Sequence, residues 1–409
     1  MSPPTKEASD QDEQSTVVKG ILLLVSVTLV TEGSLVSPAL PAIQEHFGTS
    51  APILTRLLFT VTPLTIALSS PFSGIFADRI GRKPLLIGAT VLVAVGGGIG
   101  FFLNSILQLI VARAFLGIGI GGVNVAAAAL ITDYYGGSQR ERLLGLQSAA
   151  IGFGGVVLVF LSGVLVEMSW NMPFLVFWGV LVFVPLVAWK LWEPVETEYS
   201  SALPRSVSDV QHTINQLPWR SLAVIYAVGF FVNVVFYLVI VQAPFYLTNQ
   251  IGVSASQVGM ALAVYTLFWG ISSLLYGRIK GALDVYTITA LIFALLGIGY
   301  AIVGWTASFA VIVAGLAVAG LGLGLYIPNL ITWVSFITEP ERRGRALGGL
   351  TAMFFLGQFT SPLFTQPLIQ AYGFATTFII SGGILVALML VFGFVSRIRK
   401  SPSETEAPV

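Results

Sequence analysis

Long apolar runs, separated by short polar or glycine- and proline-rich breaks, fill most of this chain of 409 residues. Twelve of the runs are long enough to cross a bilayer core of about 30 Å as helices that rise about 1.5 Å per residue. The pattern therefore predicts an all-α membrane protein with 12 transmembrane helices. The predicted helices span residues 18–42, 52–77, 84–103, 107–131, 143–166, 173–192, 219–247, 256–276, 285–305, 309–330, 346–369 and 376–395.

The basic side chains predict how these helices cross the membrane. If both termini lie on one side, every Lys and Arg in the loops or at the helix ends falls on that side, and the only two left over, Arg56 and Arg113, fall inside helices. Lys and Arg collect in cytoplasmic loops. We therefore expect both termini in the cytoplasm of a multi-pass protein of the cell membrane.

One long non-apolar stretch inside the chain divides the helices into two sets of six. The expected organisation, in chain order, is a cytoplasmic tail at 1–17, a six-helix bundle at 18–192, a cytoplasmic linker at 193–218, a second six-helix bundle at 219–396 and a cytoplasmic tail at 397–409.

The two predicted bundles also repeat in sequence. Gly277 lies 203 residues after Gly74, and Arg345 lies 203 residues after Arg142. The same offset relates the glycines at 117, 119 and 121 to those at 320, 322 and 324. One offset at separated places indicates duplication, so we expect two pseudo-symmetric six-helix bundles.

Composition narrows the function classes. The chain is 56% hydrophobic and 10% charged, whereas about a quarter of a typical soluble domain is charged. A net charge of +1 argues against nucleic acid as a partner. The chain has no cysteine, its two histidines lie far apart, and it has no phosphate-binding loop of the ATPase type. We expect no metal site, no cofactor and no enzymatic activity.

Residues 74–83, which read G-I-F-A-D-R-I-G-R-K, are a short charged loop between the second and third predicted helices. An ordinary cytoplasmic hairpin accounts for its basic residues but not for Asp78 or the two glycines. The stretch resembles the signature loop G-x-x-x-D-R-x-G-R-K of the major facilitator superfamily of secondary transporters. In that family the loop clasps the two bundles shut on the cytoplasmic side. The resemblance implies the same role for Gly74, Asp78, Arg79, Gly81 and Arg82, with Arg82 or the nearby Arg142 as the partner of Asp78.

Ionisable side chains inside the hydrocarbon are costly, so each one suggests a function. Glu32 is the only acid well inside a predicted helix, and Arg113 is expected at the same depth. An acid–arginine pair that opens and closes during transport would bind and release a proton. Alternatives are a fixed ion pair that joins helices, or a direct contact to a cationic substrate. Arg56 either caps this cluster or reaches the surface.

The fourth predicted helix adds to the resemblance. Leu109-x-x-x-Arg113-x-x-x-Gly117-x-Gly119 is similar to a motif of proton-coupled drug exporters, in which the arginine has a role in proton transfer. The chain departs from that pattern at Leu116, where the family often has glutamine. It also lacks the proline of the Gly-Pro-x-x-Gly-Gly run that drug antiporters carry in the fifth helix.

Substrate contacts are predicted from polar and aromatic side chains in the helices. Polar side chains in membrane helices either bond neighbouring helices or line a cavity. The candidates for a substrate cavity are Asn124, Asn233, Tyr237, Gln242, Tyr265, Trp269, Phe355 and Gln358. A cavity with one acid and many aromatic rings suits a bulky, amphipathic, cationic molecule.

The sequence thus predicts a monomeric transporter that exports a small organic molecule, drug-like or a metabolite, in exchange for protons. Its partners would be that substrate, protons and the lipid bilayer. A proton-coupled importer of a sugar or organic acid is the first alternative. The second is a membrane sensor that has the fold but does not transport.

Overall fold

A computed structural model describes residues 6–48, 52–193 and 217–400. Most of the predicted linker and the end of the second tail lie outside these ranges. The helices of the first half are α1 (Lys6–Ser26), η1 (Val27–Val30), α2 (Thr31–Ser34), η2 (Ser37–Ala39), α3 (Leu40–His46), α4 (Pro52–Ile80), α5 (Arg82–Gly98), η3 (Ile99–Phe102), α6 (Ile106–Tyr134), α7 (Gly137–Met168), α8 (Met172–Trp178), η4 (Gly179–Val182) and α9 (Phe183–Lys190). Those of the second half are α11 (Trp219–Tyr237), η6 (Leu238–Gln242), α12 (Ala243–Tyr246), η7 (Leu247–Ile251), α13 (Ala255–Ala282), α14 (Val285–Trp305), α15 (Phe309–Ile337) and α16 (Pro340–Lys400).

The helices confirm the predicted fold class. Eleven continuous helical stretches of the described chain are long and apolar enough to span a membrane. The last of them, α16, turns sharply at Gly373, whose φ of 80° and ψ of 170° are non-helical. A positive φ of this kind favours glycine. The turn divides α16 into two spans, which gives the twelve predicted helices.

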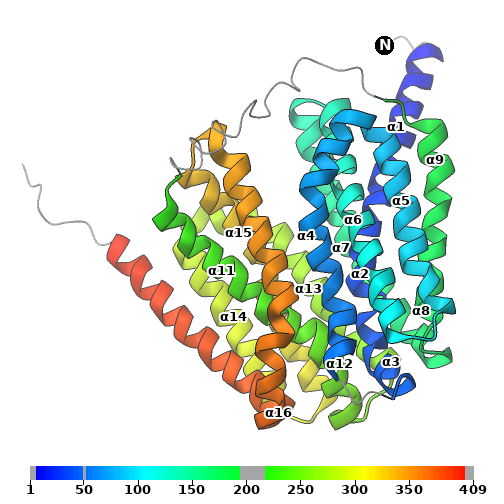
Figure 1. The fold of residues 1–409 in the computed structure, drawn as a ribbon. Coiled ribbons are helices and arrows are strands. Elements are labelled where there is room, and N and C mark those ends of the chain that lie inside the picture. Colours follow the sequence, from blue (N-terminus) through cyan, green and yellow to red (C-terminus); the bar gives the residue numbers. More distant parts are fainter. Residues whose placement is uncertain (1–5, 49–51, 194–216, 401–409) are drawn as a thin grey trace, which may run out of the picture.

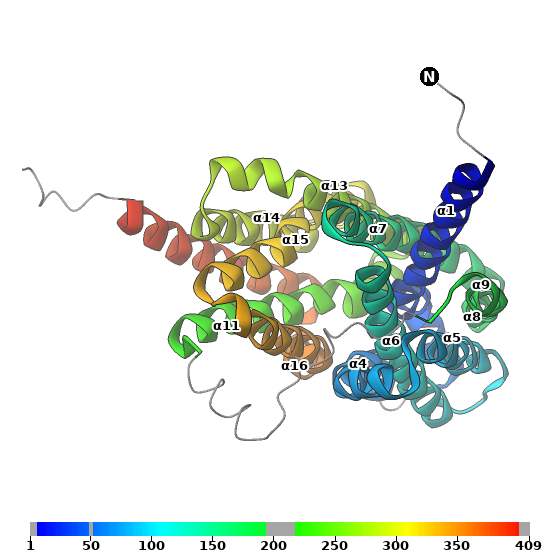
Figure 2. The same cartoon turned by 90° about the horizontal axis from the view of Figure 1, so that it is seen from above.

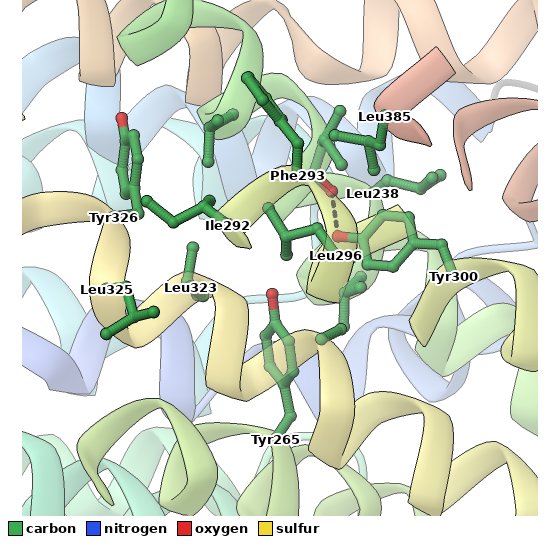
Figure 3. Packing of buried hydrophobic residues seen from close by; sticks show 14 of the residues in the cluster. Leu238, Tyr265, Ile292, Phe293, Leu296, Tyr300, Leu323, Leu325, Tyr326 and Leu385 are labelled. Carbon is green, nitrogen blue, oxygen red and sulfur yellow. Dashed lines mark hydrogen bonds between the residues drawn. The ribbon is translucent and has the colours of Figure 1, made fainter. Parts of the chain in front are cut away.

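The two halves form two bundles that lie side by side (Figure 1). Each has its own apolar core. In the second half, Ile292 and Leu296 of α14 face Leu323 of α15 (Figure 3). Phe293 and Tyr300, also of α14, pack against Phe392 and Phe378 of α16. The core of the first half includes Tyr237 and Phe245 of the second half. The seam between the halves is therefore partly an apolar contact.

The halves are in contact mainly away from the signature loop. We call the end of the bundles that carries Arg79, Arg82 and Arg342 the basic end, and the opposite end the far end. The ribbons of the two halves diverge toward the basic end (Figure 1), while α7 and α13 run side by side across the seam (Figure 2). Near the far end, a Cβ on Gly259 of α13 would lie 2.9 Å from the carbonyl oxygen of Val159 of α7. The backbones of these two helices are thus in direct contact.

Two of the membrane helices are less regular than predicted. The first begins at Lys6, inside the predicted tail, and contains the 3₁₀ turns η1 and η2. The seventh contains the π-helical segments η6 and η7. Such turns change the pairing of main-chain carbonyls and are frequent at functional sites. Both irregular stretches lie where the two halves meet.

Candidate functional site

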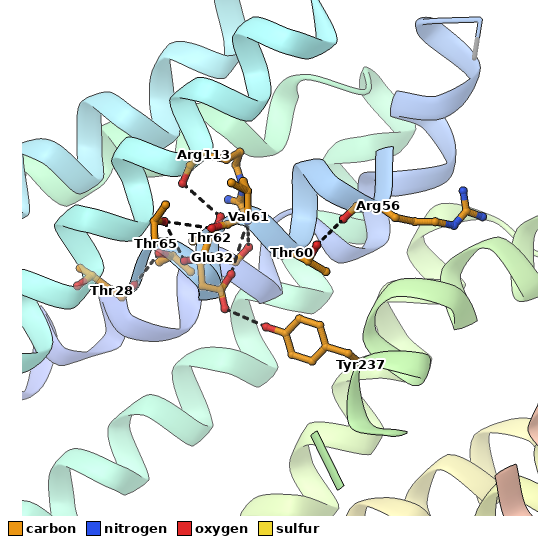
Figure 4. Close-up of polar contacts among 10 residues, drawn as sticks. Thr28, Glu32, Arg56, Thr60, Val61, Thr62, Thr65, Arg113 and Tyr237 are labelled. Atoms are coloured by element: carbon orange, nitrogen blue, oxygen red, sulfur yellow. Dashed lines mark hydrogen bonds and ion pairs between the residues drawn. The ribbon is translucent and has the colours of Figure 1, made fainter. Parts of the chain in front are cut away.

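Glu32 and Arg113 meet inside the first half, as the sequence predicts. The Nη2 atom of Arg113 lies 3.7 Å from Oε2 of Glu32 and donates a hydrogen bond of 2.7 Å to the main-chain oxygen of Glu32 (Figure 4). The Arg113 side chain is 1% exposed and that of Glu32 is 13% exposed. Glu32 therefore lies between the buried guanidinium and the space that solvent can reach.

The irregular backbone around Glu32 makes this arrangement possible. Glu32 belongs to α2, a helix of four residues between 3₁₀ turns. The last four carbonyls of a helix have no partner within it. The Glu32 carbonyl is thus available to the arginine of α6. On the other side of Arg113, its own carbonyl accepts a hydrogen bond of 3.3 Å from the Thr62 hydroxyl of α4.

The second half contributes one polar group to this pair. The Tyr237 hydroxyl, at the end of α11, donates to Oε1 of Glu32 over 3.4 Å. The Tyr237 side chain is 3% exposed, and its ring packs edge-on against Phe59 and Phe236. Glu32 Oε2 and the Nε and Nη1 atoms of Arg113 have no hydrogen-bond partner among the described residues. The pair is thus incompletely satisfied and contacts both halves.

Arg56 lies apart from this pair, in contrast to the prediction that it caps the cluster or reaches the surface. It is 3% exposed and extends away from Glu32 toward the second half (Figure 4). Its Nε donates to Gln242 over 3.2 Å, its Nη1 donates to Gln44 over 3.1 Å, and the guanidinium lies 4.5 Å from the ring centre of Phe245. Arg56 and Gln242, predicted for two different sites, form one contact across the far end of the seam.

In the signature loop, Arg82 pairs with an acid other than Asp78. Nε of Arg82 pairs with Asp133 of α6 at 2.6 Å. Asp78 is exposed and makes no hydrogen bond or ion pair with another described residue. Arg79 and Arg142 are exposed as well. The expected pairing of Asp78 with Arg82 is therefore wrong for this conformation, because Asp133 occupies the arginine.

Glu193 is a contact of the loop that the sequence did not suggest. Its carboxylate accepts hydrogen bonds from the main-chain nitrogens of Arg82, at 2.7 Å, and Lys83, at 2.9 Å. A clue in the sequence is Gly81, the residue before α5. It has no side chain to cap the helix, so another residue must accept from the first main-chain nitrogens. Gly81 has a φ of 95°, a conformation that favours glycine, and a Cβ there would lie 2.8 Å from that carboxylate.

Four predicted cavity residues lie in or beside a polar cluster of the second half. Asn233 donates to the Tyr326 hydroxyl over 2.6 Å and accepts from the Gln358 amide over 2.9 Å. Near it, Phe236 packs against Tyr265 and Trp269. The cluster links α11, α15 and α16, and only Gln358 of its three members is partly exposed.

Comparison with known proteins assigns the chain to a family. A family model described as Major Facilitator Superfamily matches residues 22–246 and 225–409. The chain belongs to the Major Facilitator Superfamily. This transporter is 27% identical over 364 residues to "Multidrug efflux protein YfmO" of Bacillus subtilis (strain 168), covering 87% of each chain. It is 24% identical over 401 residues to the "Bacillibactin exporter" of the same organism, covering 95% of this chain and 98% of the relative.

Solved structures agree on the fold. The crystal structure of a D-xylose-proton symporter matches this transporter with a TM-score of 0.75 at 17% identity, covering 92% of this chain and 97% of that one. At such identity the likeness concerns the fold alone. As a member of this family the protein is a multi-pass membrane transporter of small molecules.

The remaining predicted cavity residues of this transporter, Asn124 and Phe355, come from different halves. Asn124 follows Arg113 by 11 residues, or about three turns, and so lies on the same face of α6. Asn124 is exposed, whereas Arg113 on the same face is buried. Phe355 of α16 is partly buried and packs against the core of the first half. The inner face of α6 thus becomes accessible toward the basic end.

Proposed function

We propose that this protein exports a small organic molecule, drug-like or a metabolite, in exchange for protons by alternating access. The observation that carries the proposal is the Glu32–Arg113 pair, buried at the seam and contacted by Tyr237 from the other half. A titratable group that both halves contact can link its protonation to their relative position.

The physical reason for coupling lies in the balance of charge. While Glu32 is ionised, it compensates the buried Arg113 charge and accepts from Tyr237. A proton on Glu32 removes the compensating charge and weakens that acceptor. Leaving one buried charge without its partner costs several kcal/mol in typical proteins. Protonation therefore favours a rearrangement of the seam, and the reverse rearrangement favours release of the proton.

The basic end is proposed to be cytoplasmic, since Lys and Arg collect on that side. The conformation described here is then open to the cytoplasm and closed at the far end. The exposure of Asp78 supports this, because a clasp made by the signature loop would be released when the cavity faces the cytoplasm. We propose that Gly74, Asp78, Arg79, Gly81 and Arg82 engage the second half when the far end opens.

The substrate is proposed to bind between the Glu32 pair and the cluster around Asn233. Asn124, Gln358 and Trp269 are partly or fully exposed along this path and supply polar and aromatic contacts. The relatives that are named as exporters support outward transport.

The alternative is a proton-coupled importer of a sugar or organic acid. It is favoured by the absence of proline from residues 149–167 and by a relative named "Hexuronate transporter", 24% identical over 414 residues.

Transport into and out of proteoliposomes under an imposed pH gradient tests direction and coupling. Ethidium and a labelled hexuronate are suitable first probes. Glu32→Gln should abolish proton-driven transport while the protein still inserts and folds. The matched control is Glu339→Gln, a change of the same kind at an exposed side chain of the basic end. Proton-driven transport that survives in Glu32→Gln would exclude Glu32 from the mechanism.

A further inference from the structure

The far end of the seam contains a cavity that the proposed transport cycle does not use. Its volume is about 410 Å³. The first half contributes Gln44 and Glu45 to its wall, and the second half contributes Phe245, Thr248 and Asn249. Cavities of 300–1,000 Å³ are the usual size for small organic ligands. This one exists only while the two halves meet at the far end.

The charge around the cavity favours a cation. Among the described residues at the far end, the acids are Glu45 and Glu167, and both are exposed. Glu45 lines the cavity, and Glu167 follows Val166, which also lines it. The basic residues of the described ranges are concentrated at the opposite end, with two exceptions. Arg113 is buried in the pair with Glu32, and the Arg56 guanidinium is enclosed behind Gln44 and Phe245. The rim therefore carries a negative charge with no exposed Lys or Arg among the described residues beside it.

The cavity shares its wall with the contact that closes the far end. Gln44 and Phe245 line the cavity on one side and hold Arg56 on the other. Separation of the halves at this end would move Phe245 away from Gln44 and take the cavity apart. A ligand bound here would be lost in the open state. By linkage, such a ligand must stabilise the closed one.

We propose that this cavity is a second ligand site, which takes a small organic cation from the aqueous phase at the far end and holds the two halves together there. The site is distinct from the Glu32 pair. A cation that binds here from outside would slow transport without competing with the transported substrate, which is proposed to bind between the Glu32 pair and the cluster around Asn233.

Binding of benzyltrimethylammonium to the full chain in lipid nanodiscs, measured by calorimetry, is the first test. We expect saturable binding that Glu45→Gln weakens about fivefold, the upper range for an exposed charge pair. Glu339→Gln, at the opposite end, should leave binding unchanged. Choline should also bind more tightly than 3,3-dimethylbutan-1-ol, its neutral isostere. Absence of binding, equal binding of the isostere, or unchanged binding to Glu45→Gln would each overturn the proposal.

The conformational effect has a separate readout. The chain has no cysteine, so spin labels at Gln139→Cys and Gly344→Cys, both exposed at the basic end, report the distance between the halves. Benzyltrimethylammonium should shift the distribution toward longer distances across the basic end. An unchanged distribution or a shift to shorter distances contradicts the proposed coupling.

The two proposals can fail independently. Glu32→Gln should retain the binding of benzyltrimethylammonium even though its proton-driven transport is lost. If transport survives in that variant while Glu45→Gln still weakens binding, only the proton mechanism is wrong.

Discussion

The two halves satisfy the same main-chain acceptor in different ways. In the first half the carbonyl of Glu32 accepts a hydrogen bond of 2.7 Å from Arg113. Val235 occupies the repeat position 203 residues later, and its carbonyl accepts a hydrogen bond of 2.7 Å from the Tyr300 hydroxyl. Leu316 stands at the repeat position of Arg113. The equivalent carbonyl thus has a charged donor in one half and a neutral donor in the other, and only the charged arrangement, which includes Glu32, can respond to a proton.

The two edges of the seam at the far end differ in a similar way. Gly259 and Gln366 lie 203 residues after Arg56 and Gly163. On one edge, Gly163 and Gly259 bring the backbones of α7 and α13 into contact. On the other edge, Gln242 connects Arg56 and Gln366 through hydrogen bonds of 3.2 and 3.3 Å. The first edge is a close-packed contact, while the second consists of hydrogen bonds that can break and re-form. We infer that the halves pivot on the glycine edge.

The largest effect is expected when the first half loses one member of its charged pair. Arg113→Leu introduces leucine, the residue found at the repeat position in the second half. It leaves the Glu32 carboxylate without its cation. The free energy of unfolding should fall by about 3–5 kcal/mol. The double variant Glu32→Val with Arg113→Leu restores an apolar pair and should recover most of that loss, yet show no proton-driven transport. Thermal unfolding followed by tryptophan fluorescence measures the first effect, and wild-type stability of the single variant would contradict it.

A smaller effect is expected at the glycine edge. Gly259→Ala places a Cβ 2.9 Å from the carbonyl oxygen of Val159, so the helices must separate. Overpacking of this kind typically lowers stability by about 1–3 kcal/mol. Transport should slow as well if this edge is the pivot. Gly270→Ala in the same helix is the matched control, because nothing lies within 4 Å of its added Cβ. Equal unfolding temperatures for the two variants would rule out a tight crossing.

The sequence predicted correctly those features that depend mainly on one physical effect, the cost of placing polar or charged groups in the bilayer. Hydrophobic runs predicted the twelve spans, including the break near Gly373, because the bilayer requires apolar helices of a fixed length. Glu32 and Arg113 were matched because charges buried in one half have few other partners. The contact of Arg56 with Gln242 could not be predicted, since it crosses the seam and depends on the conformation. The 3₁₀ and π turns beside Glu32 and Gln242 result from packing between helices, which no local pattern records.

A smaller loss of stability should follow from Tyr300→Phe, which removes the hydroxyl that donates to the Val235 carbonyl in the second half. The Val235 carbonyl would lose its side-chain donor, and a hydrogen bond of this kind contributes about 0.5–1.5 kcal/mol. Proton-driven transport should remain, because no charge is altered. Tyr237→Phe is the informative counterpart, since its hydroxyl contacts Glu32. It should change the pH dependence of transport in proteoliposomes. Identical pH profiles for Tyr237→Phe and Tyr300→Phe would mean that Tyr237 has no part in coupling.

The smallest effect concerns the first turn of two equivalent helices. Asp284, the residue before α14, accepts from the nitrogens of Tyr286 and Thr287. Gly81 stands at the repeat position before α5, and there the remote Glu193 supplies the carboxylate. Loss of either acceptor should lower stability by about 0.5–1 kcal/mol, the usual contribution of a helix cap.

The two caps should nevertheless differ in their effect on transport. Glu193→Ala releases the signature loop from the end of the first half, so transport should slow more than the stability loss explains. Asp284→Ala, of similar effect on stability, should leave the rate unchanged because its helix carries no clasp. Transport rates and unfolding temperatures measured on both variants decide the matter. If the two variants slow transport equally, the remote cap is only a structural substitute for a missing side chain at Gly81.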